Sequence, residues 1–195
     1  YLNWLDHLLQ YNNLLPMKLS GTTYEFKIFD SPSEMMAEIK KLNRYKNKSR
    51  MVAGYCWDWN SRKNSHQKDI VIGDDFAYKW NLSNDDTWSI SKGSVDQIGC
   101  IHTCQGLEFE YVGVIIGEDL VYRDGIIKVN PSKRSSNDRS IWGWKKMEQE
   151  DRESTHDKLR ALIKNTYRTL MTRGMKGCYV YVCDEELRNY IKQWI

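Results

Sequence analysis

Apolar positions along the chain switch repeatedly between a helical spacing and short continuous runs. Steps of three and four residues between apolar positions are typical of a helix with one buried face. This spacing predicts helices within 1–10, 31–42, 159–173 and 184–194. Continuous or alternating apolar runs bounded by polar turns predict strands at 24–30, 50–57, 97–102, 111–117 and 178–183.

The start of the second helix carries the clearest capping signal. Ser31 fits the N-cap, Pro32 fits the first helical position, and Glu34 completes a capping box. A strand at 24–30 therefore leads directly into a helix. The polar residues 58–68 have neither periodicity and predict a loop.

Two further segments have the pattern of short antiparallel strands. Within 69–91 the strands are expected to meet at a turn over 83–86. Over 121–129 the dipeptide Asp124 and Gly125 is a strong hairpin signal, since both positions of such a turn need a positive φ.

Strands that are apolar on both faces and alternate with helices indicate an α/β fold, with a largely parallel sheet flanked by helices and added β-hairpins. The length of 195 residues indicates one domain over 1–195. Residues 58–92 and 118–153 fit this pattern least and are interpreted as insertions or hairpins within the domain. The polar stretch 130–153 is expected to be a mobile excursion rather than part of the core.

Charge changes this picture little. The net charge is +3, so a nucleic-acid site would have to be a local patch. The segment from Lys40 to Arg50 holds six basic residues in eleven. It is either a solvated helix end or a surface that meets a nucleic-acid backbone.

Aromatic residues are unusually frequent, with 8 Trp and 12 Tyr. They either pack in the core and hairpins or form stacking surfaces for bases. The sequence leaves both alternatives open for Trp57, Trp59, Trp80 and Trp88.

The five cysteines lie in apolar runs, without any C-x-x-C pair. Buried, reduced thiols in a cytoplasmic protein are the simplest interpretation. No apolar run approaches the roughly 18 residues of a membrane-spanning helix, so no membrane association is expected. The chain opens inside a helical pattern, which suggests a fragment of a longer protein.

Several motifs of enzyme chemistry are missing from the sequence. It contains no G-x-x-x-x-G-K-[ST] phosphate loop, no G-x-G-x-x-G, no G-x-S-x-G and no H-E-x-x-H. Glu118 and Asp119 end an apolar run as Mg²⁺-binding acids do, but they are interpreted as a solvated strand end because no phosphate loop accompanies them.

Residues 101–109 place polar groups between two apolar runs. His102, Thr103 and Gln105 follow a strand, and ligands of open α/β sheets bind beyond the carboxyl ends of the strands. A turn opening into a short helix there would offer unpaired N–H groups to an anion, and Gly106 would allow close approach. Alternatively, His102 and Thr103 merely cap the turn.

Arg173 is the second candidate, at the end of the helix over 159–173. A cation at a helix C-terminus is favoured by the helix dipole and is common. The other interpretation is a guanidinium directed from a rigid helix at phosphate oxygens.

Together these two segments resemble superfamily-1 helicases. Residues 101–117 match the fifth conserved motif of that family and read IHTCQGLEFEYVGVIIG. Residues 165–182 resemble the sixth motif and read NTYRTLMTRGMKGCYVYV. Both motifs belong to the second, C-terminal RecA-like domain, whereas the phosphate loop belongs to the first. The sequences of residues 52–59, VAGYCWDW, and 99–108, GCIHTCQGLE, resemble those of an uncharacterised bacterial helicase-like family akin to the Schlafen P-loop ATPases.

The resemblance implies a nucleotide site shared with another domain. Arg173 would be an arginine finger on the γ-phosphate, oriented by Thr172, and Gly106 and Glu108 would face the nucleotide, with Glu108 on the ribose. Gln105 stands where many relatives carry lysine, which weakens its assignment to the nucleotide.

The resemblance also implies partners and cofactors. His102 and Thr103 would face a single strand of DNA or RNA. ATP and Mg²⁺ would bind only together with an N-terminal RecA-like domain that carries the phosphate loop, so the 195-residue chain alone is expected to be inactive. The alternative is a non-catalytic module that binds nucleic acid or protein.

Overall fold

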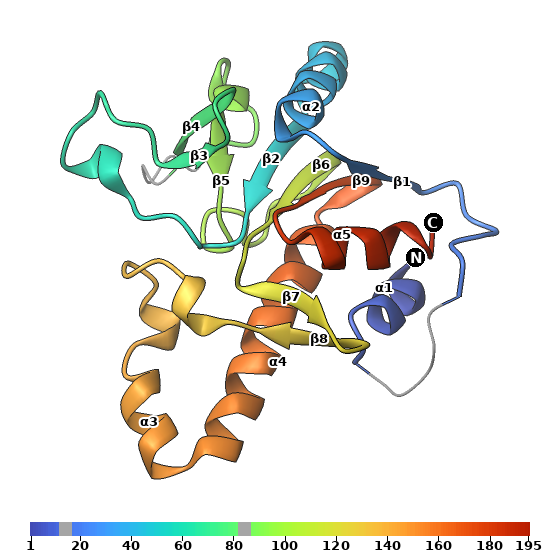
Figure 1. The fold of residues 1–195 in the computed structure, drawn as a ribbon. Coiled ribbons are helices and arrows are strands. Elements are labelled where there is room, and N and C mark those ends of the chain that lie inside the picture. The colour runs from blue at the N-terminus through green and yellow to red at the C-terminus, as the bar shows by residue number, and fades with distance from the viewer. Residues whose placement is uncertain (12–16, 82–86) are drawn as a thin grey trace.

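Parallel strands alternating with helices build the centre of the molecule (Figure 1). The computed structural model describes residues 1–11, 17–81 and 87–195. Within these residues, seven strands form one sheet in the order β1-β9-β6-β2-β5-β4-β3. The strands are β1 (Glu25–Phe29), β2 (Ser49–Ala53), β3 (Ile70–Ile72), β4 (Phe76–Trp80), β5 (Gln97–Gly99), β6 (Phe109–Ile116) and β9 (Gly174–Val182). All neighbours pair in parallel except β3 and β4.

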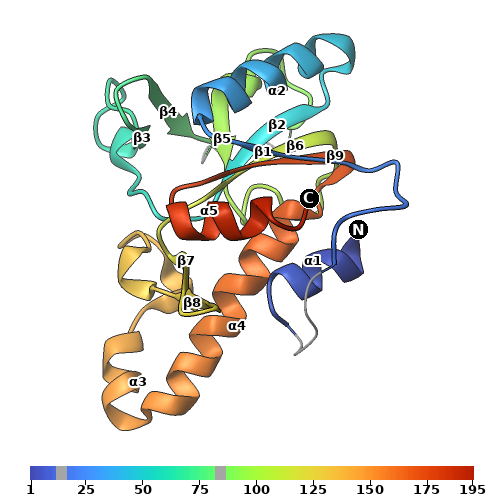
Figure 2. The same cartoon turned by 45° about the vertical axis from the view of Figure 1, so that its right-hand side comes forward.

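Helices cover both faces of this sheet, as the second view shows (Figure 2). The helices are α1 (Leu2–Leu8), α2 (Pro32–Lys46), α3 (Trp144–Glu150), α4 (Arg152–Met171) and α5 (Glu185–Lys192). Helix α2 packs on one face, and α1, α4 and α5 pack on the other. The predicted α/β fold is therefore confirmed. No helix in the described ranges is long and apolar enough to cross a bilayer.

The predictions of an N-cap at Ser31 and of a hairpin over 121–129 are confirmed. The Ser31 hydroxyl accepts from the Glu34 N–H at 3.3 Å, and Pro32 is the first residue of α2. Strands β7 (Leu120–Arg123) and β8 (Ile126–Val129) form the predicted hairpin. Its two turn residues, Asp124 and Gly125, have φ of 57° and 77°.

The segment 69–91 differs from its prediction in one respect. Strands β3 and β4 are antiparallel as expected, but β4 also pairs in parallel with β5 and so extends the central sheet. Residues 87–91 form a turn rather than a strand, and the turn expected at 83–86 lies outside the described residues. Trp80 and Trp88 are buried, which favours core packing for these two rings.

The stretch 130–153 is not merely a polar excursion, so that expectation is wrong. It contains short 3-10 turns and helix α3, and it places Arg134, Asp138 and Ile141 in buried positions. Helix α3 and the first half of α4 project together away from the sheet in both views (Figures 1 and 2). Arg134 connects this stretch to the core through an ion pair with the buried carboxylate of Asp119.

The basic run from Lys40 to Arg50 is also not one surface. Arg50 is fully buried in β2 and donates to neutral oxygen acceptors, including the carbonyls of Trp88 and Ser49 and the side chain of Asn43. Burial lowers the pKa of Arg50 to about 10, so the guanidinium stays charged at neutral pH. This arginine holds loops together rather than contacting a partner.

Candidate functional site

Residues 100–108 connect two opposite edges of the sheet. The shared register of β5, β2 and β6 sets Gly99 level with Val114, near the carboxyl end of β6. Strand β6 begins several residues earlier, at Phe109. The connecting segment therefore starts at the carboxyl edge and ends at the amino edge. The expectation that His102, Thr103 and Gln105 lie at the carboxyl edge therefore concerns only the first part of this segment, because the chain must return to the amino edge to start a parallel strand.

The segment is built from turns. The N–H groups of Thr103 and Cys104 both donate to the Cys100 carbonyl at 3.1 Å, and the Leu107 N–H donates to the Cys104 carbonyl at 3.1 Å. No helix follows these turns within the described residues, so the predicted short helix is wrong. An anion site based on a helix N-terminus loses its basis here.

His102 and Thr103 occupy the carboxyl side of the segment and differ in their contacts. The Thr103 hydroxyl accepts from the Cys100 N–H at 2.9 Å and lies 3.2 Å from the Cys100 carbonyl, to which it donates. Thr103 thus caps the turn. His102 is exposed, and its ring lies 6.3 Å from that of Tyr55 in an edge-on arrangement.

Gln105, Gly106 and Glu108 are exposed on the way to the amino edge. Gly106 has φ of +77°, which favours glycine, and nothing lies within 4 Å of the place where a Cβ would stand. The backbone at Gly106 is therefore open to close approach by another molecule.

Arg173 lies at the same amino edge, just beyond α4. Its Nε donates to the Thr169 carbonyl at 3.1 Å, and its own carbonyl accepts from the Phe109 N–H at 2.8 Å. Phe109 pairs with Gly174 in the β6–β9 ladder. Glu108 and Arg173 each immediately precede one member of this pair. The fold thus places these two residues next to each other.

The electrostatic surroundings of Arg173 leave its charge available. None of the ion pairs among the described residues includes it. Burial raises the pKa of the Cys104 thiol, and the positive charge of Arg173 acts in the opposite direction. Nearby, Glu110 pairs with Lys46 at 3.2 Å and Lys176 at 3.1 Å.

Thr172 shares an acceptor with this arginine. Its hydroxyl donates to the Thr169 carbonyl at 2.9 Å, the same oxygen that accepts from the Arg173 Nε. Both side chains therefore fold back on the last turn of α4. The side chain of Thr172 is therefore linked to that of Arg173 through the shared Thr169 carbonyl.

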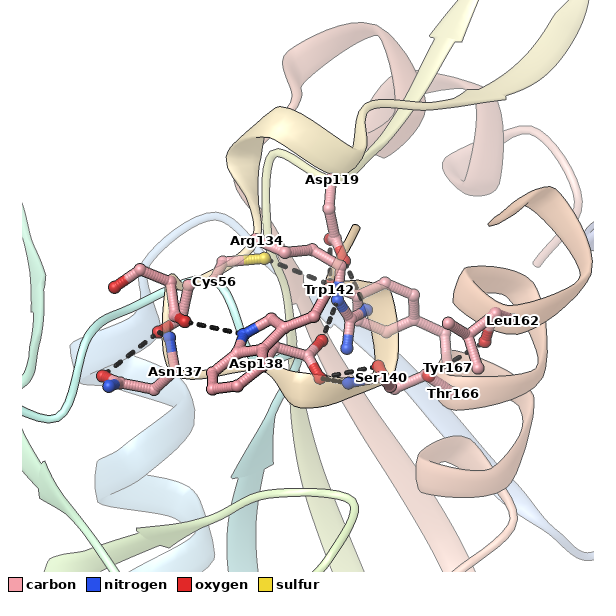
Figure 3. Close-up of polar contacts among 12 residues, drawn as sticks. Cys56, Asp119, Arg134, Asn137, Asp138, Ser140, Trp142, Leu162, Thr166 and Tyr167 are labelled. Carbon is pink, nitrogen blue, oxygen red and sulfur yellow. Dashed lines mark hydrogen bonds and ion pairs between the residues drawn. The ribbon is translucent and has the colours of Figure 1, made fainter. Parts of the chain in front are cut away.

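A buried polar network at the carboxyl edge was missed by sequence reasoning (Figure 3). Asp119 is fully buried, accepts from the Tyr167 hydroxyl, and pairs with the Arg134 guanidinium at 3.0 Å. Arg134 also pairs with buried Asp138. The Gly117 N–H donates to the Tyr167 oxygen at 2.9 Å. The interpretation of Asp119 as a solvated strand end is therefore wrong.

Burial dominates the electrostatics of this network. It raises the pKa of Asp119 above its ordinary value, although Arg134 acts in the opposite direction. Burial alone would lower the pKa of Arg134, but its carboxylate partners outweigh that effect and raise it. The neighbouring Glu118 behaves as predicted, because it is exposed and pairs with Lys133 on the surface. No spacing in the sequence distinguishes these two acids.

A comparison with known protein families identifies the family to which this chain is related. A model of the family described as Schlafen group 3, DNA/RNA helicase domain, matches residues 1–184. The chain belongs to this family. It is thus a helicase-like, nucleic-acid-related domain, which agrees with the helicase resemblance of its motifs. No solved structure matches it significantly.

A curated yeast protein is similar to almost the whole of this chain. The uncharacterised protein YPL245W of Saccharomyces cerevisiae is 29% identical over 205 residues, covering 96% of this chain. The match spans 43% of the yeast protein, so the chain corresponds to less than half of that relative's length. The bacterial origin expected from the sequences of residues 52–59 and 99–108 stays a prediction.

Proposed function

We propose that this Schlafen-type helicase domain is the C-terminal RecA-like half of an ATP-dependent nucleic-acid motor. Residues 58–92 and 118–153 are proposed insertions into that half. The protein is proposed to act in the cytoplasm. ATP and Mg²⁺ bind between it and an N-terminal RecA-like domain that supplies the phosphate loop. Family membership supports a helicase-like role, and the arrangement of Glu108 and Arg173 supports the finer assignment.

The contact between Phe109 and Arg173 carries this proposal. It joins two segments that are distant in sequence and that separately resemble helicase motifs. An acid, Glu108, and an arginine that forms no ion pair in the described part of the chain, Arg173, then share an edge beside the open backbone of Gly106. This is the combination that a nucleotide needs, since a ribose hydroxyl donates to a carboxylate and a guanidinium binds phosphate oxygens.

Each residue at the amino edge then has a role. Arg173 stabilises the charge that develops on the γ-phosphate during transfer. Glu108 accepts from the ribose, and Gly106 lets the nucleotide approach the backbone. Gln105 is exposed beside Gly106 and makes at most a polar contact. Glu110 at this edge is held by two lysines and is therefore not proposed as a Mg²⁺ ligand, so the N-terminal domain and the phosphates would supply those ligands.

The carboxyl side of the same segment faces a single strand of DNA or RNA. His102 is exposed there and contacts the strand directly. A phosphate would compete with the Cys100 carbonyl for the hydroxyl proton of Thr103. Thr103 therefore contributes mainly by holding the turn that presents His102. One segment thus connects the nucleotide to the strand.

The division of labour between domains gives the first test. The purified 195-residue chain is expected to show no ATP turnover, whereas a protein that joins it to its phosphate-loop domain hydrolyses ATP. Hydrolysis is measured by phosphate release with and without single-stranded oligonucleotides. Appreciable turnover by the chain alone contradicts the proposal. Lack of turnover by the joined protein favours a non-catalytic binding module.

Glu108→Gln tests the nucleotide side separately. The KM for ATP in the joined protein is expected to rise about tenfold, because a neutral amide oxygen replaces the stronger carboxylate acceptor of the ribose hydroxyl. The kcat should change little, since the ribose contact is the same in ground and transition states. Glu186→Gln is the matched control, an exposed acid on α5. An unchanged KM for Glu108→Gln removes the ribose assignment.

A further inference from the structure

The segment 131–147, called here the arm, carries an exposed tryptophan with a fixed ring. All eight tryptophans lie in the described ranges, and Trp142 is the one classed as exposed, at 61%. Its Nε1 donates to the Ser136 carbonyl at 3.1 Å, which satisfies its single polar atom. The Arg139 guanidinium lies 5.4 Å from the ring centre. The ring is thus ordered without being buried.

A hollow of about 540 Å³ lies beside this ring. Trp142, Trp144, Lys145 and Lys146 contribute to its lining together with Ser135 and Ser136. Trp144 is half-buried, and the Lys145 ammonium lies 5.9 Å from its ring centre. Aromatic and cationic side chains therefore line the same concave region.

The charge of the arm is strongly one-sided. Residues 131–146 contain five cationic side chains and one acid. The acid, Asp138, is buried against Arg134, so neither contributes to the surface. The remaining cations are exposed and are Lys133, Arg139, Lys145 and Lys146. Lys133 pairs with Glu118, and Lys146 lies 4.0 Å from Glu150 at the exposed surface, where such a pair is weak.

We propose that the arm is a stacking platform for single-stranded nucleic acid, with a base on Trp142 and the backbone along Arg139, Lys145 and Lys146. This rests on the proposed function, because it extends the strand path that begins at His102. A ring face stacks on an unpaired base of any sequence, and the cations neutralise phosphates. A duplex hides its base faces, so the platform favours single strands.

Hydrogen bonds make the platform continuous with that path. The Ser135 N–H donates to the Tyr55 carbonyl at 2.9 Å, and the Tyr55 ring contacts the His102 ring. Ser136, whose carbonyl holds Trp142, donates through its N–H to Asp58 at 3.0 Å. A nucleic-acid strand that passes His102 would therefore reach the arm next.

Trp142→Ala is the direct test. Binding of fluorescein-labelled dT20 and rU20 to the 195-residue chain is measured by anisotropy over a range of salt. We expect about tenfold weaker binding, as for loss of one base–aromatic stack, and Trp142→Phe should recover part of it. Comparing dT20 with rU20 shows which sugar the platform prefers. Tyr45→Ala is the matched control, since Tyr45 is 80% exposed on α2.

A charge variant and a cross-link complete the experiment. Lys145→Glu with Lys146→Glu should reduce the salt dependence of binding by about one to two phosphate contacts, whereas Lys18→Glu with Lys192→Glu, at two exposed lysines outside the arm, should not. An oligonucleotide carrying 5-iodouracil should cross-link to the peptide that contains Trp142. Circular dichroism checks that each variant is folded.

The outcomes separate this proposal from the motor itself. Unchanged affinity in Trp142→Ala, or a cross-link that maps elsewhere, overturns the platform even if hydrolysis by the joined protein still depends on Arg173. Absence of oligonucleotide binding by the unmodified chain at low salt also overturns it. Equal effects of Trp142→Ala on single-stranded and duplex ligands overturn the stacking mechanism.

Discussion

If the proposed motor is correct, Arg173→Ala is expected to abolish ATP hydrolysis by the protein that joins this domain to its phosphate-loop domain, lowering kcat by about 10³- to 10⁵-fold. The guanidinium is proposed to bind oxygens whose negative charge grows during phosphoryl transfer, so its loss acts on the transition state. The fold should be retained. Arg173 is half-buried, forms no ion pair among the described residues, and its side chain donates to one carbonyl, that of Thr169.

Controls on the same helix make this result specific. Arg168 is the matched arginine, since it lies one turn earlier and pairs with Asp6 of α1. Arg168→Ala should lower stability and leave kcat close to that of the unmodified protein. Arg173→Lys should recover part of the rate, because a point charge replaces a planar fork. Retained ATP binding with lost hydrolysis is the expected pattern. Unchanged hydrolysis in Arg173→Ala shows that another group stabilises the phosphate.

The fold was predictable wherever burial alone decides structure. Strand β6 and the second half of β9 carry apolar residues on both faces because helices cover both sides of the sheet, and that pattern is visible in sequence. The Ser31 cap and the Asp124-Gly125 turn are local, so they too were predictable. The periodicity of apolar residues does not show at which edge of the sheet a connecting segment ends.

The candidate site shows this limit. The motif resemblance named Glu108 and Arg173, whereas the argument from the carboxyl ends of strands concerned His102, Thr103 and Gln105 and did not place Glu108. The register between β6 and β9, which sets these residues side by side, depends on contacts far apart in sequence. Burial of Asp119 likewise depends on Arg134 and Tyr167, which approach only after folding.

Arg134→Met is expected to destabilise the domain by about 3–5 kcal/mol, because it leaves carboxylates buried without their cation. Arg134 is sealed between Asp119 and Asp138, with side-chain exposures of 1%, 0% and 0%. Urea unfolding followed by circular dichroism measures the loss. Lys133→Met is the matched control, since Lys133 pairs with Glu118 at the surface and should cost about 1 kcal/mol or less.

The pH dependence of this loss follows from the direction of the Asp119 pKa. Burial already raises that pKa in the folded state, and removal of Arg134 raises it further. The folded variant then binds a proton that the unfolded chain, with a pKa of about 3.9, releases at neutral pH. Stability of Arg134→Met should therefore fall as pH rises from about 4 to 7, so the gap to the unmodified protein widens. A gap that is constant over this range, or a loss no larger than that of Lys133→Met, would mean that the network is solvated in solution and does not anchor the arm.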